Sequence, residues 1–190
     1  SASSFVGDVV KIFHPPDNEL AGYFAPFEKV KGKILFKADE LSLWTGINGH
    51  GKSQFIGQIV LSQMKQGARV CIASLELKPE RLLMRLTRQA AALDCPAKGY
   101  IEAVHDWYSD KLWIFNLVGT AKADRLIEVF TYARQRYGID VFVIDSLMKC
   151  GISEEDYPQQ KLFVEKLCDF KNIFLLFIIL IIINNLLILP

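Results

Sequence analysis

Residues 46–53 read Gly46-Ile-Asn-Gly-His-Gly-Lys-Ser53, which is the spacing of a glycine, four residues and then Gly-Lys-Ser. Glycines allow successive backbone N–H groups to point into one concavity, where they can cradle phosphate oxygens at the start of a helix. In such a loop the lysine, here Lys52, reaches the outer phosphates, and the hydroxyl of Ser53 ligates Mg2+. The motif therefore predicts a phosphate-binding loop.

The residues on both sides of the motif have the pattern that a phosphate loop needs. Residues 40–45 alternate polar and apolar side chains as a strand does, and residues 54–65 carry apolar side chains at helical spacing. Strand, loop and helix follow in the required order, and a glycine-rich turn in an unrelated α/β domain is the alternative. The residues expected to contact ATP or another nucleoside triphosphate are Gly46, Ile47, Asn48, Gly49, His50, Gly51, Lys52, Ser53 and Gln54.

Strand and helix patterns alternate along the rest of the chain. Strands are predicted at residues 33–36, 41–45, 69–75, 111–116 and 139–144. Helices are predicted at residues 54–65, 79–93, 121–137 and 158–171. The stretch 96–110 is ambiguous, although residues 101–107 fit a short helix. This alternation predicts a mostly parallel sheet flanked by helices, a three-layer α/β fold.

Length and composition place limits on the class of protein. A chain of 190 residues suits one globular domain, and 22 basic against 21 acidic side chains give a net charge of +1. This balance neither supports nor excludes a DNA partner, since basic groups can be confined to a few loops. The four cysteines are far apart and form no CxxC pair, which argues against a zinc site and suits a reducing cytoplasm.

The first residues differ in composition from the predicted core. The chain opens on Ser-Ala-Ser-Ser without Met, which is typical of a fragment of a longer polypeptide, and residues 13–18 carry two prolines with Asp and Asn. No secretory signal pattern opens it. We expect residues 1–30 to be a lead-in segment outside the main sheet and residues 31–190 to form the core.

The last residues, 173–190, form an uncharged apolar tail interrupted only by Asn184 and Asn185 before the final proline. Three interpretations stay open: a membrane span, a buried strand with an apolar continuation, or letters that do not reflect the true side chains. No Trp, Tyr, Lys or Arg marks a far membrane boundary, and the α/β rhythm requires another strand here, so a membrane span is disfavoured. The letters of the tail are given no functional weight.

Two acidic residues follow predicted strands in the same way that the phosphate loop follows Thr45. Glu76 comes directly after the strand 69–75, and Asp145 directly after 139–144. The carboxyl ends of parallel strands line one crevice, so Asp145 is expected to hold Mg2+ together with Ser53. Ser146 stands where many ATPases carry a glutamate, and Glu76 is therefore the candidate base that activates water. Both carboxylates could instead cap a helix or turn.

Three segments resemble the RecA-type motor of DnaB-family replicative helicases, in the branch of phage primase-helicases and mitochondrial Twinkle. They are Leu43-Trp-Thr-Gly-Ile-Asn-Gly-His-Gly-Lys-Ser53, Ala73-Ser-Leu-Glu-Leu-Lys-Pro-Glu-Arg-Leu-Leu-Met-Arg-Leu86 and Val141-Phe-Val-Ile-Asp-Ser-Leu147. The second segment is the most diagnostic, because a generic phosphate-loop protein has no reason to carry it. The resemblance spans residues 31–172.

The resemblance implies a RecA-like P-loop NTPase that uses ATP and Mg2+. It implies that Glu76 is the catalytic base, that Lys52 and Ser53 bind phosphate and Mg2+, and that Asp145 is the Walker B aspartate. It also implies a homo-oligomeric ring, a hexamer in the family, that translocates on single-stranded DNA and unwinds forked duplex during replication. A primase domain or partner and a bacterial or phage-infected cytoplasm fit this picture better than a mitochondrial matrix or a membrane.

The chain departs from the family after Asn172, where a polar phosphate sensor, DNA-binding loops and an arginine finger are expected. The tail shows none of them, so the core is expected to be truncated on its carboxyl side. Two other functions share the loop and Asp145: a RecA-like or circadian-type ring ATPase that remodels a protein or nucleoprotein assembly without unwinding, and a nucleotide-binding scaffold. The segment around Glu76 favours the helicase.

Overall fold

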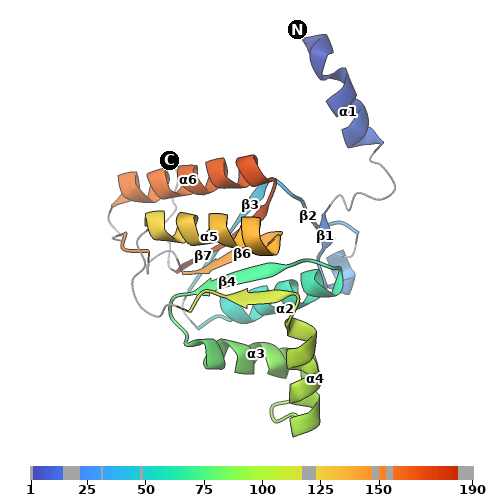
Figure 1. The fold of residues 1–190 in the computed structure, drawn as a ribbon, viewed down its shortest axis with the longest axis vertical. Helices are drawn as coiled ribbons and strands as arrows, with labels where there is room; N and C mark the ends of the chain where they lie inside the picture. The colour runs from blue at the N-terminus through green and yellow to red at the C-terminus, as the bar shows by residue number, and fades with distance from the viewer. Residues whose placement is uncertain are drawn as a thin grey trace.

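A five-stranded parallel sheet forms the centre of the molecule, as the ribbon shows (Figure 1). The computed structural model describes residues 2–14, 22–30, 32–47, 49–116, 123–146, 150–152 and 156–183. The strands in spatial order are β3 (Glu40–Gly46), β7 (Phe177–Ile183), β6 (Val141–Asp145), β4 (Val70–Ser74) and β5 (Leu112–Ile114). The order differs from the chain order, so helices must cross over between strands.

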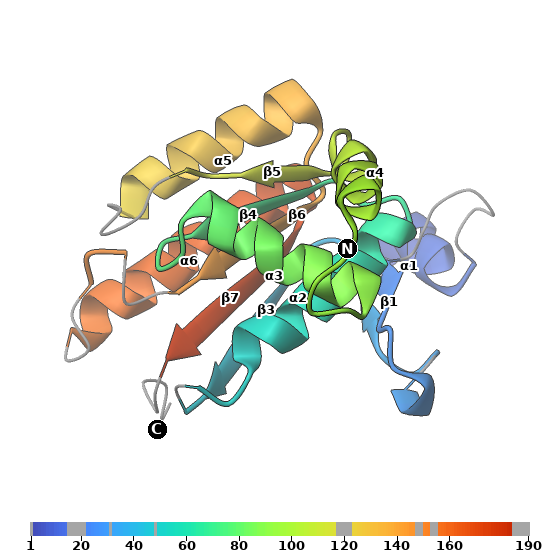
Figure 2. The same cartoon turned by 90° about the horizontal axis from the view of Figure 1, so that it is seen from below.

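Helices cover both faces of this sheet. Figure 1 shows α5 (Ala123–Tyr137) and α6 (Tyr157–Phe174) on one face, and α2 (Lys52–Lys65) and α3 (Pro79–Ala91) on the other. The view from below shows the same separation, with α2 and α3 in front of the strands (Figure 2). The predicted three-layer α/β fold with a mostly parallel sheet is therefore confirmed.

The two central strands β4 and β6 are buried along their whole length, as expected for a sheet covered on both faces. Their side chains contribute to two separate apolar clusters, one on each side. On the α5 and α6 side, Phe142 of β6 packs against Phe130 and Phe170, with ring centroids 4.4 and 5.5 Å away. Such aromatic packing contributes a large share of the burial that stabilises a domain of this size.

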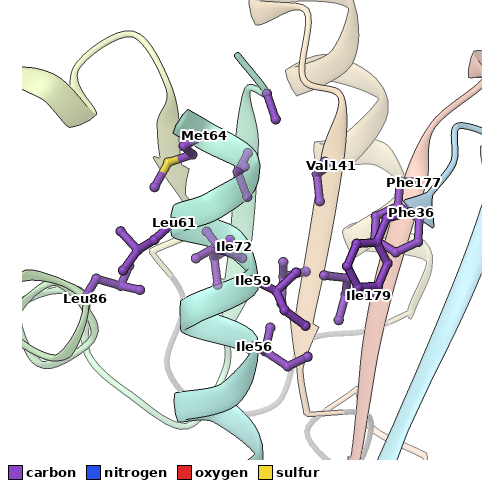
Figure 3. Close-up of a cluster of buried hydrophobic side chains, with 14 of the residues drawn as sticks. Phe36, Ile56, Ile59, Leu61, Met64, Ile72, Leu86, Val141, Phe177 and Ile179 are labelled. Carbon is purple, nitrogen blue, oxygen red and sulfur yellow. The ribbon is translucent and has the colours of Figure 1, made fainter. Parts of the chain in front are cut away.

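On the opposite face, α2 lies directly on the strands. Figure 3 shows Ile56 and Ile59 of α2 pointing toward Val141 and Ile179 of the sheet. These side chains are three residues apart on the helix, so they share one face, which is the pattern that predicted this helix. The packing fixes the start of α2, and with it the phosphate loop, against the sheet.

The apolar tail contributes the strand β7, between β3 and β6. Its backbone pairs with β3 over residues 40–46 and with β6 over residues 141–145. The side chains of residues 177–181 are buried, as the buried-strand interpretation expects for this part of the tail. Asn184, Asn185 and the remaining tail residues lie outside the described residues. In the described part of the chain no helix is both long enough and apolar enough to cross a membrane.

The segment before the core forms its own small elements. β1 (Tyr23–Phe24) pairs antiparallel with β2 (Leu35–Phe36) and not with the main sheet. The side chain of Gln66 holds β1 on α2, because its amide accepts from the Phe24 N–H at 2.8 Å and donates to the Phe24 carbonyl at 3.0 Å. A 3-10 turn (Ala2–Phe5) and α1 (Val6–Phe13) stand away from the sheet in Figure 1. A second 3-10 turn spans Glu28–Val30.

The ambiguous stretch at residues 96–110 contains a helix, α4 (Lys98–Tyr108). Only Val104 and Tyr108 of this helix are buried, so its apolar stripe is short and its sequence pattern is weak. The other predicted helices and strands are present, with ends that differ from the predicted ones by a few residues.

Candidate active site

The carboxyl ends of three strands bring the predicted site residues to one edge of the sheet. Because the strands are parallel, the loop after β3, Glu76 after β4 and Asp145 at the end of β6 leave the sheet on the same side. The register places Asp145 opposite Ser74 of β4 and opposite Ile181 of β7. In an open parallel sheet this edge is where ligands bind.

The loop before α2 has the backbone shape that phosphate binding needs. Gly49 and Gly51 have φ angles of 79° and 81°, in the left-handed region that favours glycine. Gly51 is also the N-cap of α2 and supplies no side-chain hydrogen bond. The first N–H groups of α2 therefore have no side-chain cap, and such donors at a helix start attract phosphate oxygens. This backbone fits a nucleoside triphosphate.

The other loop residues lie around this concavity. The ammonium group of Lys52 donates to the backbone carbonyl of Gly46 and, at 2.9 Å, to that of Ile47, so it lies inside the loop. The side chains of Ile47, His50 and Gln54 are exposed. Asn48, which is also expected to contact the nucleotide, lies outside the described residues.

Ser53 and Asp145 are in direct contact although they are far apart in the chain. The Ser53 hydroxyl donates to the Asp145 carboxylate, with an Oγ to Oδ2 distance of 2.8 Å. Hydroxyl and carboxylate oxygens are the ligands that Mg2+ prefers. Within the described ranges no group of three or more His, Cys, Asp or Glu side chains is placed to hold a metal ion. Mg2+ at this pair would therefore also need phosphate oxygens and water.

The pKa of the Asp145 carboxyl is raised above its ordinary value of 3.8. Burial is the main cause, because the side chain is only 7% exposed and burial penalises the charged form. The hydrogen bond from Ser53 opposes this shift, the charge of Glu76 adds to it, and the cations Arg85 and Lys52 oppose it. A divalent cation bound here would favour the charged carboxylate.

Glu76 lies at the next strand and has a partner of its own. The Ser146 hydroxyl donates to the Glu76 carboxylate, with an Oγ to Oε1 distance of 2.8 Å. Glu76 is exposed, whereas Ser146 is fully buried. The site thus contains two serine–carboxylate pairs that start from adjacent residues, Asp145 and Ser146, at the end of β6.

Both pairs border one cleft of about 1120 Å3 between the loop, α2 and α3. The predicted residues that line it are Gly49, His50, Gly51, Lys52, Ser53, Gln54, Glu76 and Asp145. Arg85 of α3 and Phe27 also line it, and the sequence pattern assigns neither of them a role. Arg85 belongs to the segment that carries the resemblance, whereas Phe27 lies in the predicted lead-in and gives no signal in the sequence.

Comparison with solved structures identifies the fold. A solved ATPase domain from a DnaB-family helicase superposes with a TM-score of 0.74 and 16% sequence identity, over 95% of this chain and 70% of that chain. The chain has a RecA-like ATPase fold. This RecA-like fold is common, since 434 solved chains match, so the fold alone does not determine the activity.

Sequence comparisons add no closer relative. No family model matches the chain. No curated protein matches it either. The RecA-like fold therefore comes from structural similarity, and the roles of individual residues depend on the geometry of the cleft.

Proposed function

We propose that this chain is the ATP-hydrolysing motor of a helicase similar to the DnaB family. One observation carries the proposal: Lys52 and Ser53 after β3, Glu76 after β4 and Asp145 at the end of β6 all line the same cleft. Phosphoryl transfer depends mainly on positioning and on stabilising charge, and these are the groups that it needs. The fold shared with the solved helicase ATPase domain supports ATP as the substrate.

Each group has a separate task in the proposed reaction. The N–H groups at the start of α2 and the ammonium of Lys52 bind the phosphates and stabilise their charge. Ser53 and Asp145 would hold Mg2+, which neutralises charge on the phosphate oxygens when it is bound. Glu76 accepts a proton from a water molecule and orients that water for attack on the terminal phosphate.

The segment around Glu76 favours a DNA motor over other RecA-like ATPases. In the family that it resembles, the motor forms a ring of six copies around single-stranded DNA and opens a forked duplex. We propose these partners for this chain on the same residues. The alternative is a RecA-like ring ATPase that remodels an assembly, which shares Lys52, Ser53 and Asp145 and hydrolyses ATP without strand separation.

Substitution of the loop lysine and the candidate base tests the proposal. Lys52→Ala and Glu76→Gln are expected to lower DNA-stimulated ATP hydrolysis by about 100-fold or more, because each removes a group that acts on the transferred phosphate or the water. The matched controls are Lys65→Ala, at the exposed end of α2, and Glu80→Gln, in the first turn of α3. Both controls keep the activity of the unmodified protein. Full activity in either site variant contradicts the assignment.

A strand-displacement assay separates the helicase from the alternative. Forked DNA with one labelled strand is incubated with ATP and the protein, and release of that strand is measured. We expect release that needs ATP and is absent in Lys52→Ala. ATP hydrolysis without any release, and without stimulation by single-stranded DNA, would favour the remodelling ATPase.

A further inference from the structure

We infer that Ser146 is a positioning residue that holds the Glu76 carboxylate in place for water activation, an inference that rests on the proposed function of Glu76. The two residues leave neighbouring parallel strands, β4 and β6, at the same level. The backbone confirms this alignment, because Ser74 pairs with Asp145 and the Leu75 N–H donates to the Asp145 carbonyl at 2.8 Å. The side chains that follow, Glu76 and Ser146, are therefore brought side by side.

The hydrogen bond joins a buried group to an exposed one. Ser146 is fully buried, and a buried hydroxyl needs a partner. That partner is the Oε1 atom of Glu76, an exposed side chain with several rotatable bonds. A hydrogen bond to a charged carboxylate is stronger than one between neutral groups. The buried serine thus restricts a side chain that would otherwise move freely at the mouth of the cleft.

Restriction of Glu76 matters because water activation depends on geometry. Ser146 occupies only Oε1, so Oε2 can accept the proton of a water molecule. Fixing a catalytic group before the reaction lowers the entropy that must be lost in the transition state. Ser146 also follows Asp145 directly, so the pair Asp145 and Ser146 fixes the metal ligand and the candidate base from one strand end.

This arrangement gives a role to the residue after Asp145. A glutamate at that position would bring its own carboxylate to the cleft, whereas a serine brings only a hydroxyl. In this chain the carboxylate comes from the neighbouring strand, and the hydroxyl reaches it across 2.8 Å. Ser146 contributes through Glu76 and not through direct contact with the nucleotide, since it does not line the cleft among the described residues.

Steady-state kinetics of Ser146→Ala test this role. We expect kcat for ATP hydrolysis to fall about 10-fold, with KM and the affinity for a non-hydrolysable ATP analogue unchanged within about 2-fold, because phosphate binding does not involve Ser146. Ser74→Ala is the matched control, since Ser74 is also buried but its hydroxyl has no hydrogen-bond partner among the described residues. It is expected to keep the original kcat.

A double-mutant cycle with Glu76→Gln separates positioning from a general structural effect. If Ser146 acts through Glu76, Ser146→Ala lowers the residual single-turnover rate of Glu76→Gln by less than about 2-fold. An equal loss in both backgrounds, or an unchanged kcat in Ser146→Ala, overturns the inference. Full activity of Glu76→Gln alone is a different outcome and contradicts the proposed function itself.

A second variant guards against loss of the fold. Folding of Ser146→Ala is checked by its unfolding transition and by binding of the ATP analogue. If that variant does not fold, Ser146→Cys keeps a side chain of similar size and replaces the hydroxyl with a weak thiol donor. A folded Ser146→Cys is expected to show a kcat at least about 3-fold lower with unchanged analogue binding, and an unchanged kcat would count against the inference.

Discussion

The carboxyl group of Asp145 is buried beside the Ser53 hydroxyl at the end of β6. Burial raises its pKa above 3.8, so the charged form that binds Mg2+ is the form that the folded, metal-free protein tolerates least. A group of this kind lowers the stability of the protein in return for its chemistry. The cost falls on one residue and can be measured there.

Asp145→Asn is expected to stabilise the metal-free protein by about 1 kcal/mol at pH 8 while it abolishes ATP hydrolysis. The amide has the same shape, its oxygen can still accept from Ser53, and the buried charge is removed. The free energy of unfolding, measured by urea denaturation in the presence of a chelator, checks the stability. An Asp145→Asn protein that is less stable than the original at pH 8 contradicts this account.

The pH dependence of the same comparison has a defined sign. Because the pKa of Asp145 is higher in the folded than in the unfolded state, the folded protein binds more protons from pH 3.8 upward, through the raised pKa. Its free energy of unfolding therefore falls as the pH rises through this window. The advantage of Asp145→Asn grows over the same window and is smallest at the acid end.

The residues of the phosphate loop could be predicted from the sequence because their chemistry depends on spacing along the chain. Asp145 and Glu76 could be predicted as neighbours because both follow strands of a parallel sheet. The hydrogen bond between Ser146 and Glu76 could not, since it depends on β4 and β6 being adjacent and on their register. Chain order gives no measure of either.

At the scale of single elements, α5 shows how burial divides a helix into two faces. Leu126, Phe130 and Ala133 are buried against β6 and α6, whereas Tyr132 on the same helix is 59% exposed. The spacing of the buried residues is three and four, as a helix with one apolar stripe requires.

Leu126→Ala is expected to lower the free energy of unfolding by about 3 kcal/mol, because it removes apolar contacts and leaves a cavity in a closely packed core. Tyr132→Ala on the same helix serves as the control and is expected to change it by less than about 1 kcal/mol. Denaturant unfolding followed by circular dichroism measures both. Similar losses in the two variants would show that α5 does not pack as described.

Two elements carried too little periodicity for a firm assignment from sequence. α4 buries few side chains, so its pattern is weak, and β7 is apolar throughout, which suits a buried strand and a membrane span equally well. α1 has apolar residues at helical spacing, including Val6, Val9 and Phe13, which could have indicated a helix within the predicted lead-in. Its apolar side chains are exposed, so burial does not explain it.

At the scale of the whole molecule, β7 joins the two halves of the sheet. It pairs with β3 on one side and with β6 on the other, and β3 pairs with no other strand of the main sheet. The loop after β3 and Asp145 at the end of β6 are therefore held together through a strand that contributes neither of them.

Two shortened chains test this dependence. A chain that ends at residue 174 lacks β7 and is expected to show no cooperative unfolding transition, because β3 and β6 lose their common partner and the buried side chains around it. Removal of residues 1–14 takes away only α1 and the turn before it, and Tm is expected to change by less than about 3 °C. Calorimetry measures both, and a cooperative transition in the first chain would contradict the central role of β7.

The position of β7 also has a consequence for synthesis on the ribosome. β3 and β6 leave the exit tunnel before residues 177–183 have been translated, and until then the facing edges of these strands have unpaired N–H and C=O groups. Such edges on a nascent chain invite aggregation and are a target for chaperones. The phosphate loop and Asp145 reach their final spacing only after β7 inserts, so the chain becomes able to capture a nucleotide late in its own translation.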